Sequence, residues 1–430
     1  MAKTFKVNVV TGQGGGGHYA TYRAIEAIAQ QRNLPWKLQV TDMDEIITGL
    51  SQAGEIQNAY ETFGFSGHDL YNLMVKGGRT RLWPLKMRLN KFLVEITYQT
   101  GLRTFTEHWR KYEPDLVVSV MPLYNKGLYE SLQIAQPGTP YVTVLTDFAD
   151  CPPAFWFDLE AENTLVCGTD RAVEQARSLQ IPPNRIVKSS GLVIHPDFSQ
   201  QAPISEPARI IQRQALDLEA QTPTGIVMFG GNGSRTMLDI AKRLEPLADQ
   251  IQLIFVCGNN ADIAEALSAY SGPQKRAVVG FVDDMANYMR LSDFFIGKPG
   301  NVSVSEALAM GLPIITECAL TTMSQEKYCA QWVKNNGMGI VVSSFKQVRS
   351  AVVEMIQPAK YQRFKQKVSA FDNQAVFEVA ELLENILLES ILKKDSSAPS
   401  SLGLNSPTSA PIPESVPETA QGTERVSTVV

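Results

Sequence analysis

The sequence predicts an α/β protein with two Rossmann-like domains that face each other across a cleft. Three observations predict this fold. Short apolar runs alternate with longer amphipathic stretches, the alternation restarts halfway along the 430 residues, and each half has a glycine-rich turn between a strand and a helix. We place the two domains at residues 1–197 and 208–394, followed by a disordered tail at residues 395–430, and we expect a ligand to bind between the domains.

Each predicted strand is a short apolar run that ends in Gly, Asp or Pro, which is typical of a parallel sheet. In the first domain these runs are residues 5–10, 38–40, 116–120, 141–145 and 164–166. In the second domain they are residues 225–229, 251–257, 277–279, 294–296 and 313–316.

Two further segments decide the domain organisation. Residues 196–207 are rich in proline and polar residues and form the predicted hinge. Residues 375–392 have a strongly helical sequence, and one hypothesis is that this helix packs back across the first domain. Beyond Lys394 the chain is rich in Ser, Pro, Thr and Ala and has no aromatic residue, so this tail cannot bury enough surface to fold.

Composition limits the classes of function. The formal net charge of -5 argues against a nucleic-acid binder, and 44% hydrophobic residues are typical of a globular protein. The five cysteines lie far apart without a CxxC pair, so they predict reduced thiols and not a disulfide frame or zinc site. No segment reads as a signal peptide or as a bilayer span of roughly 18 apolar residues. We therefore expect a cytoplasmic protein.

The first glycine-rich turn ends in a histidine. It runs from Gly12 through four consecutive glycines to His18, between the first strand and the first helix. Glycines let backbone N–H groups approach an anion, and the positive potential of a helix N-terminus keeps an imidazole neutral, as a general base must be. The spacing also fits a dinucleotide fingerprint with Asp42 as the ribose acid. A bound NAD and a plain structural turn both stay open as alternatives.

The second half offers two more candidate ligand loops. Residues 229–234 follow a strand and precede a helix, so their amides and the Ser234 hydroxyl suit a pyrophosphate, with a structural turn as the alternative. Residues 279–313 form a strand, a glycine-rich turn, a helix and the next strand. Glu306 falls in the first turns of that helix, where it could accept two hydrogen bonds from a ribose diol. A helix-dipole role is the alternative.

This last block resembles the nucleotide-sugar site of GT-B glycosyltransferases. Together with the first glycine loop it is similar to glycosyltransferase family 28, which contains monogalactosyldiacylglycerol synthases and the N-acetylglucosaminyltransferase of lipid II assembly. The resemblance covers roughly residues 5–340. It is closer to the diacylglycerol enzymes, judged from the motifs at residues 119–123, 143–147 and 191–198.

The resemblance implies a role for each site residue. For the UDP-sugar it implies Phe281 and Val282 at the uracil, Glu306 at the ribose, Gly231, Gly233, Ser234, Gly300, Asn301 and Ser303 at the diphosphate, and Gln325 and Glu326 at the sugar hydroxyls. On the acceptor side it implies Gly15, Gly16 and Gly17, with His18 as the catalytic base and Asp147 as the second candidate.

The sequence departs from this pattern in two places. Residues 150–157 lack the histidine that the diacylglycerol enzymes usually carry there, and His195 stands where those enzymes favour arginine. Asp42 and Asp44 also form the D-x-D of metal-dependent transferases, but a helix cap explains an Asp after a strand equally well. We therefore expect neither a metal nor another cofactor, and the acceptor stays open.

Residues 71–91 are unusually basic and aromatic for an acidic chain. Arg81, Trp83, Lys86 and Arg88 are the predicted contacts with an anionic membrane, because Trp suits the headgroup region and cationic side chains are attracted to anionic lipid. The alternative is a solvated basic face.

The sequence and the resemblance together predict an inverting transfer of galactose or glucose from a UDP-sugar to a lipid hydroxyl, with diacylglycerol as the favoured acceptor. The enzyme would associate peripherally with a membrane. Three alternatives stay open: transfer of N-acetylglucosamine to a polyprenyl-linked sugar, epimerisation of a UDP-sugar, and a noncatalytic lipid or nucleotide sensor.

Overall fold

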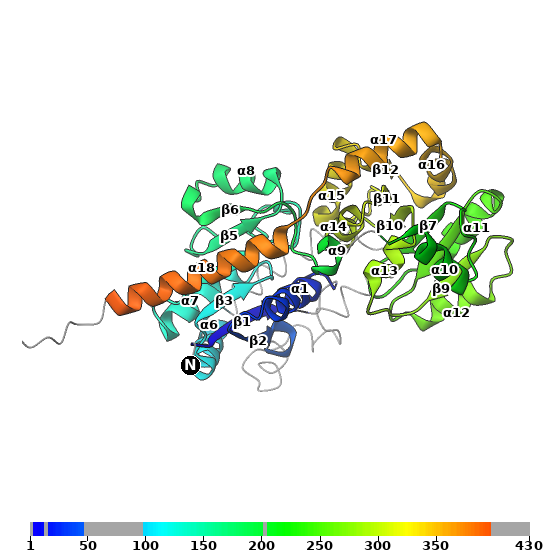
Figure 1. The fold of residues 1–430 in the computed structure, drawn as a ribbon. Coiled ribbons are helices and arrows are strands. Elements are labelled where there is room, and N and C mark those ends of the chain that lie inside the picture. Colours follow the sequence, from blue (N-terminus) through cyan, green and yellow to red (C-terminus); the bar gives the residue numbers. More distant parts are fainter. Residues whose placement is uncertain (1–2, 13–15, 47–97, 201–203, 397–430) are drawn as a thin grey trace, which may run out of the picture. The chain divides into compact units, whose positions relative to one another are not determined.

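The computed structural model describes residues 3–12, 16–46, 98–200 and 204–396. Its described strands form two six-stranded sheets, all parallel, with helices between most successive strands (Figure 1). The predicted α/β class is therefore confirmed. Gly15, the tail beyond residue 396 and the four predicted membrane residues Arg81, Trp83, Lys86 and Arg88 lie outside the described residues.

The first sheet has the order β2-β1-β3-β4-β5-β6. Its strands are β1 (Phe5–Thr11), β2 (Trp36–Asp42), β3 (Leu116–Ser119), β4 (Tyr141–Val144), β5 (Thr164–Cys167) and β6 (Ile186–Lys188). Strand β1 is central, with Val9 paired in register to Val40 of β2 and to Val118 of β3. Every residue of β3 and β4 is buried, as expected for strands covered on both faces.

The second sheet has the order β12-β11-β10-β7-β8-β9. Its strands are β7 (Thr224–Met228), β8 (Gln252–Val256), β9 (Arg276–Val279), β10 (Phe294–Gly297), β11 (Ile314–Glu317) and β12 (Gly339–Val342). All ten predicted runs correspond to strands, and β6 and β12 are additional.

The described helices fall into two groups along the chain. Those up to residue 200 are α1 (Gly17–Gln31), α6 (Tyr98–Tyr112), α7 (Asn125–Ala135), α8 (Asp170–Ser178) and α9 (Asp197–Gln200), the last of them within the predicted hinge. Those after residue 200 are α10 (Glu206–Ala215), α11 (Thr236–Leu244), α12 (Ala261–Ala269), α13 (Met285–Arg290), α14 (Asn301–Ala309), α15 (Ser324–Asn335), α16 (Val348–Met355), α17 (Pro358–Ser369) and α18 (Ala375–Ser396). Among the residues in these ranges, no helix is both long and apolar enough to cross a membrane.

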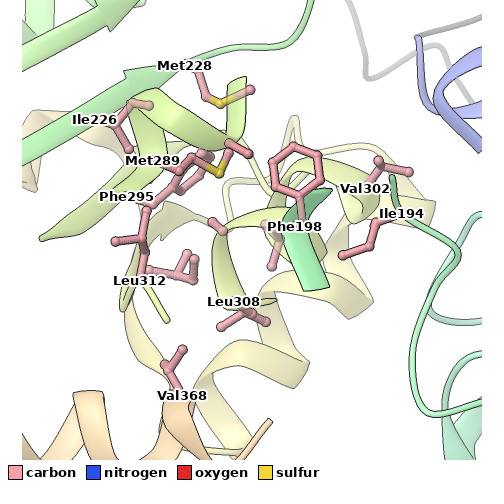
Figure 2. Packing of buried hydrophobic residues seen from close by; sticks show 14 of the residues in the cluster. Ile194, Phe198, Ile226, Met228, Met289, Phe295, Val302, Leu308, Leu312 and Val368 are labelled. Carbon is pink, nitrogen blue, oxygen red and sulfur yellow. The ribbon is translucent and has the colours of Figure 1, made fainter. Parts of the chain in front are cut away.

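One apolar core joins residues from both halves of the chain. Figure 2 shows Ile226 and Met228 of β7 and Leu308 of α14 in this cluster, together with Ile194 from before the predicted hinge and Phe198 from α9 within it. The described residues up to Ser390 form one compact unit. The limits 1–197 and 208–394 therefore stay a prediction.

The chain crosses between its halves at two segments that contact each other. Asn373 Nδ2 donates to the carbonyl of Leu192 at 2.9 Å, and the Ser190 N–H donates to Glu378 of α18 at 2.7 Å. The guanidinium of Arg32 lies 5.4 Å from the ring centre of Phe377. Helix α18 therefore begins against the first half, which agrees with the hypothesis that it packs back there.

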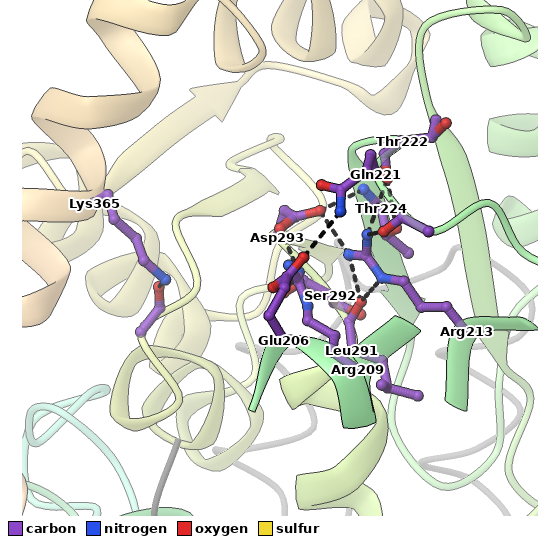
Figure 3. A network of polar contacts seen from close by, with 12 residues as sticks. Glu206, Arg209, Arg213, Gln221, Thr222, Thr224, Leu291, Ser292, Asp293 and Lys365 are labelled. Carbon is purple, nitrogen blue, oxygen red and sulfur yellow. Dashed lines mark hydrogen bonds and ion pairs between the residues drawn. The ribbon is translucent and has the colours of Figure 1, made fainter. Parts of the chain in front are cut away.

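A buried arginine fixes α10, the first helix after the hinge, to the second sheet (Figure 3). Arg213 is 1% exposed and donates to the carbonyl of Leu291 and to Asp293 Oδ2, the latter at 2.9 Å. Asp293 also accepts from Arg209 and from the N–H of Thr224, the first residue of β7. This network satisfies the buried charge and holds the C-terminal end of α10 in place.

Candidate functional site

The predicted site residues follow the carboxyl ends of parallel strands, where ligands bind in open α/β sheets. In the first half the loops after β1 and β4 carry His18 and Asp147. In the second half the predicted UDP-sugar residues follow four different strands: Gly231, Gly233 and Ser234 follow β7, Phe281 and Val282 follow β9, Gly300, Asn301, Ser303 and Glu306 follow β10, and Gln325 and Glu326 follow β11.

His18 lies in the first turn of α1, behind a glycine that the turn requires. Gly16 is the N-cap residue and has a φ of 80°, a left-handed conformation that favours glycine. Gly17 faces α14 closely, since a Cβ built on it would lie 3.3 Å from Val302 Cγ2. The first glycine loop therefore packs against the helix predicted to hold the sugar donor.

The imidazole of His18 is enclosed by residues from other loops. Its Nδ1 lies 3.1 Å from Thr146 Oγ1, and its ring centre lies 6.1 Å from that of Trp156. Burial lowers the pKa of His18 to about 4, and a hydrogen bond with the backbone of Val120 partly opposes this shift. His18 is therefore neutral at pH 7, as predicted. The main cause is burial, however, and not the helix N-terminus.

Asp147 is a buried carboxyl that receives two hydrogen bonds. Trp156 Nε1 donates to Oδ2 at 2.8 Å, and Asn301 Nδ2 donates to Oδ1 at 2.6 Å. Burial raises its pKa to about 7, and the nearby carboxylates of Glu326 and Asp150 add to the rise, while the two hydrogen bonds oppose it. Because both of its oxygens accept hydrogen bonds from protein groups, Asp147 is placed to position its neighbours.

Asn301, at the start of α14, contacts Asp147 only through the Nδ2 atom of its amide. Its Oδ1 atom is buried and has no hydrogen-bond partner among the described residues. Its backbone carbonyl accepts from Ser305 Oγ at 2.9 Å. The Asp147–Asn301 contact thus joins the loop after β4 to the helix after β10. The sequence predicts the first segment on the acceptor side and the second at the UDP-sugar.

Gln325 and Glu326 of α15, which are predicted to bind the sugar hydroxyls, already have partners within the protein. Glu326 is buried and its Oε1 lies 2.9 Å from Nζ of Lys298, a residue that the sequence analysis did not assign. The neighbouring Gln325 is half-buried and accepts a long 3.4 Å hydrogen bond from Ser324 Oγ. Lys298 follows β10 directly, so it brings a positive charge to the sheet edge where an anionic donor is predicted.

Glu306 is half-buried on α14, and its carboxyl has no hydrogen bond or ion pair within the described part of the chain. Burial alone raises its pKa to about 8. An unpaired, partly desolvated carboxyl is free to bind vicinal hydroxyls. Ser303 lies three residues earlier and is also half-buried, which places it on the same helix face.

The glycine loop after β7 has free space at Gly231 and is tightly packed at Gly233. Gly231 is exposed, and a Cβ built there would meet no atom within 4 Å, whereas one on Gly233 would lie 2.8 Å from the carbonyl oxygen of Cys257. Gly233 also has a φ of 53°. The hydroxyl of Ser234 already accepts from the N–H of Thr236, the first residue of α11.

Phe281 and Val282 follow β9. Phe281 is 66% exposed, which is unusual for a large apolar side chain and leaves it available to a ligand. Strand β9 lies beside β8, and β8 lies beside β7, so this loop shares a sheet edge with the open glycine loop.

Several contact residues were missed from the sequence. Thr146 and Trp156 touch His18, and Asp150 holds the Trp156 loop because its Oδ1 accepts from the N–H groups of Phe155 and Trp156. The available signal was the segment 150–157 itself, where aromatic residues follow an Asp. Asp42 Oδ1 accepts from the N–H of Asp44 at 2.8 Å, which matches the helix-cap reading of the D-x-D pair.

This chain is similar to known sugar transferases. Residues 225–386 match the glycosyltransferase family 28 C-terminal domain. The chain is 28% identical over 421 residues to the probable monogalactosyldiacylglycerol synthase 3 of Oryza sativa subsp. japonica, covering 93% of this chain and 78% of that protein. It is 26% identical over 306 residues to the processive diacylglycerol beta-glucosyltransferase of Bacillus subtilis (strain 168), covering 70% and 76%.

Solved structures confirm the fold. Acinetobacter baumannii MurG aligns with a TM-score of 0.55 at 12% identity, over 89% of this chain and 100% of that chain. A putative UDP-N-acetylglucosamine 2-epimerase from Listeria monocytogenes aligns with a TM-score of 0.56 at 12% identity, over 91% and 97%. The fold alone therefore does not separate a transferase from an epimerase. Together with the family 28 match and the two relatives, it identifies this chain as a glycosyltransferase of GT-B fold whose residues 225–386 match the C-terminal domain of glycosyltransferase family 28.

Proposed function

We propose that this enzyme transfers galactose or glucose from a UDP-sugar to the hydroxyl of diacylglycerol at a membrane surface, with inversion at the anomeric carbon. The observation that carries the proposal is the position of His18, a neutral imidazole in a glycine loop that packs against α14. The names of the two relatives support the acceptor, since both contain diacylglycerol.

The donor binds along the carboxyl edge of the second sheet. Phe281 and Val282 meet the uracil, Glu306 holds the ribose diol, and the N–H groups at Gly231, Gly233 and the start of α14 hold the diphosphate. Backbone N–H groups at a helix N-terminus suit this task, because the leaving diphosphate gains negative charge as the glycosidic bond breaks. Lys298 adds a positive charge at the same edge.

His18 acts on the acceptor. It takes the proton of the attacking hydroxyl while the hydroxyl oxygen forms a bond to the anomeric carbon of the sugar. The bond between that carbon and the phosphate oxygen breaks, and its electron pair leaves with UDP. Asp147 positions Trp156 beside the base and Asn301 at the donor helix, so it serves the reaction through its neighbours.

The test supplies diacylglycerol vesicles and a panel of UDP-galactose, UDP-glucose and UDP-N-acetylglucosamine, and identifies the products by mass spectrometry. We expect a hexosyl-diacylglycerol. A product formed only on a polyprenyl-linked sugar, or an epimerised UDP-sugar without any acceptor, would support the corresponding alternative instead.

His18→Ala tests the base within the same assay. We expect turnover to fall by about 100-fold or more, the usual contribution of a general base, with UDP binding largely intact. Because burial lowers the pKa of His18 to about 4, the base stays neutral between pH 5 and 8, and activity should show no fall towards pH 5 from its protonation. His108→Ala is the matched control, since burial also lowers the pKa of His108 to about 4 and a threonine hydroxyl contacts it. Unchanged turnover in His18→Ala would remove His18 from this role.

A further inference from the structure

Thr146 places a buried hydroxyl against the histidine that the proposed function uses as base. Thr146 is 4% exposed, and its Oγ1 lies 3.1 Å from His18 Nδ1 across 128 residues of sequence. It lies two residues after the end of β4 and directly precedes Asp147, whose carboxyl is fixed by Trp156 and Asn301. The backbone at Thr146 is therefore held between strand β4 on one side and the hydrogen-bonded Asp147 on the other.

A neutral imidazole has one N–H and one nitrogen with a free lone pair, and only the second can act as a base. The partner of one ring nitrogen decides which of the two carries the proton. Thr146 Oγ1 lies at hydrogen-bonding distance from Nδ1 and can accept the proton on that atom, while the backbone of Val120 is a second hydrogen-bond partner of the same ring. Nε2 then keeps the lone pair for the substrate.

We propose that Thr146 is a positioning residue that holds the Nδ1 proton and the ring orientation of His18, so that Nε2 takes the proton of the acceptor hydroxyl. This inference rests on the proposed function of His18. Throughout the reaction the Nδ1 proton stays on His18 and is hydrogen-bonded to Thr146 Oγ1. The proton of the acceptor hydroxyl passes to Nε2, and the resulting imidazolium releases this second proton to water after UDP leaves.

The experiment compares Thr146→Val with Thr146→Ser in the full-length enzyme. Valine keeps the shape of threonine and lacks the hydroxyl, whereas serine keeps the hydroxyl. We expect valine to lower kcat roughly tenfold while the KM for the UDP-sugar changes by less than about twofold, and serine to restore most of the rate. Thr41→Val is the matched control, because Thr41 Oγ1 lies 2.8 Å from Nε2 of His108 in the same kind of contact.

Nitrogen NMR of the labelled histidine ring gives a direct readout. In the unmodified enzyme His18 should carry its proton on Nδ1, and Thr146→Val should shift the ring towards a mixture of both forms. A proton on Nε2 in the unmodified enzyme, or an equal loss of rate in the serine and valine variants, would overturn the inference. Full activity of His18→Ala would instead defeat the proposed base itself. Full activity of Thr146→Val with an inactive His18→Ala would defeat the positioning role alone.

Discussion

Replacing Asp147 with asparagine should make the protein more stable at pH 8 than the unmodified chain, while leaving it folded at pH 5. Two buried donors, Trp156 Nε1–H and Asn301 Nδ2–H, point at the carboxyl oxygens. Asparagine keeps an acceptor for Trp156 and adds a donor. Asn301 can accommodate that donor by turning its amide, because its Oδ1 is buried and has no partner among the described residues. Asp147→Leu would leave both donors unpaired, at about 1–3 kcal/mol each.

The magnitude follows from the pKa of Asp147, which burial raises from 3.8 to about 7. Between these values the native carboxyl keeps a proton that the unfolded chain has released, so the free energy of unfolding falls as pH rises through this range. A shift of about three pKa units corresponds to about 4 kcal/mol in total, of which about 3 kcal/mol is lost between pH 5 and pH 8. Asparagine does not titrate and avoids this loss.

Urea unfolding at pH 5, 6, 7 and 8 measures the free energy of unfolding of both proteins. The difference should grow by about 3 kcal/mol in favour of Asp147→Asn from pH 5 to pH 8. The infrared band of a protonated carboxyl that disappears near pH 7 in the unmodified protein should be missing in the variant. A stability difference that stays constant across this range would refute the assignment of a raised pKa to Asp147.

Two further substitutions test how the segments outside the site are held. Gly191→Ala should lower the free energy of unfolding by about 1–3 kcal/mol in a urea titration, because its Cβ would lie 2.6 Å from Cγ of the buried Asn373. Gly101→Ala, whose Cβ would make an ordinary 3.9 Å contact, should cost nothing, and equal effects would contradict the argument. Arg213→Met should lower the thermal midpoint by several degrees. The backbone carbonyls of Leu291 and Ala220 and the carboxylate of Asp293 would each lose a hydrogen bond from the buried guanidinium. The exposed Arg363→Met should not lower the midpoint, and a matching loss in that variant would show that charge alone matters.

The strands could be predicted well because parallel strands are buried on both faces and appear as apolar runs. The two that were missed, β6 and β12, are both edge strands that pair on one side only. Their residues are mostly half-buried, with β6 only three residues long and β12 four. Partial burial relaxes the need for a continuous apolar run, so the sequence signal there is short and mixed.

The parts of the site that depend on backbone geometry could be predicted from the sequence. Glycine at residue 16 is needed for a positive φ, and the parallel sheets bring the loops after several strands to one edge. The partners of each side chain were harder to predict. The contact of His18 with Thr146 joins segments 128 residues apart, and that of Asp147 with Asn301 joins segments 154 residues apart. No local pattern specifies such pairs, because they depend on how the loops from both sheets pack.

The burial of Asp147 is the feature that most needs a reason, because a desolvated carboxyl destabilises the folded state at neutral pH. A hydrophobic side chain in its place would avoid that cost, but it could not accept from Trp156 on one side and Asn301 on the other. These two partners lie beside His18, the proposed base, and at the start of α14, the proposed donor helix, respectively. A displacement of either by about 1 Å can slow a group transfer by roughly 100-fold. The carboxyl of Asp147 therefore lowers the stability of the folded state but fixes the distance between the proposed base and the proposed donor helix, and Asp147→Asn should keep this distance where Asp147→Leu should not.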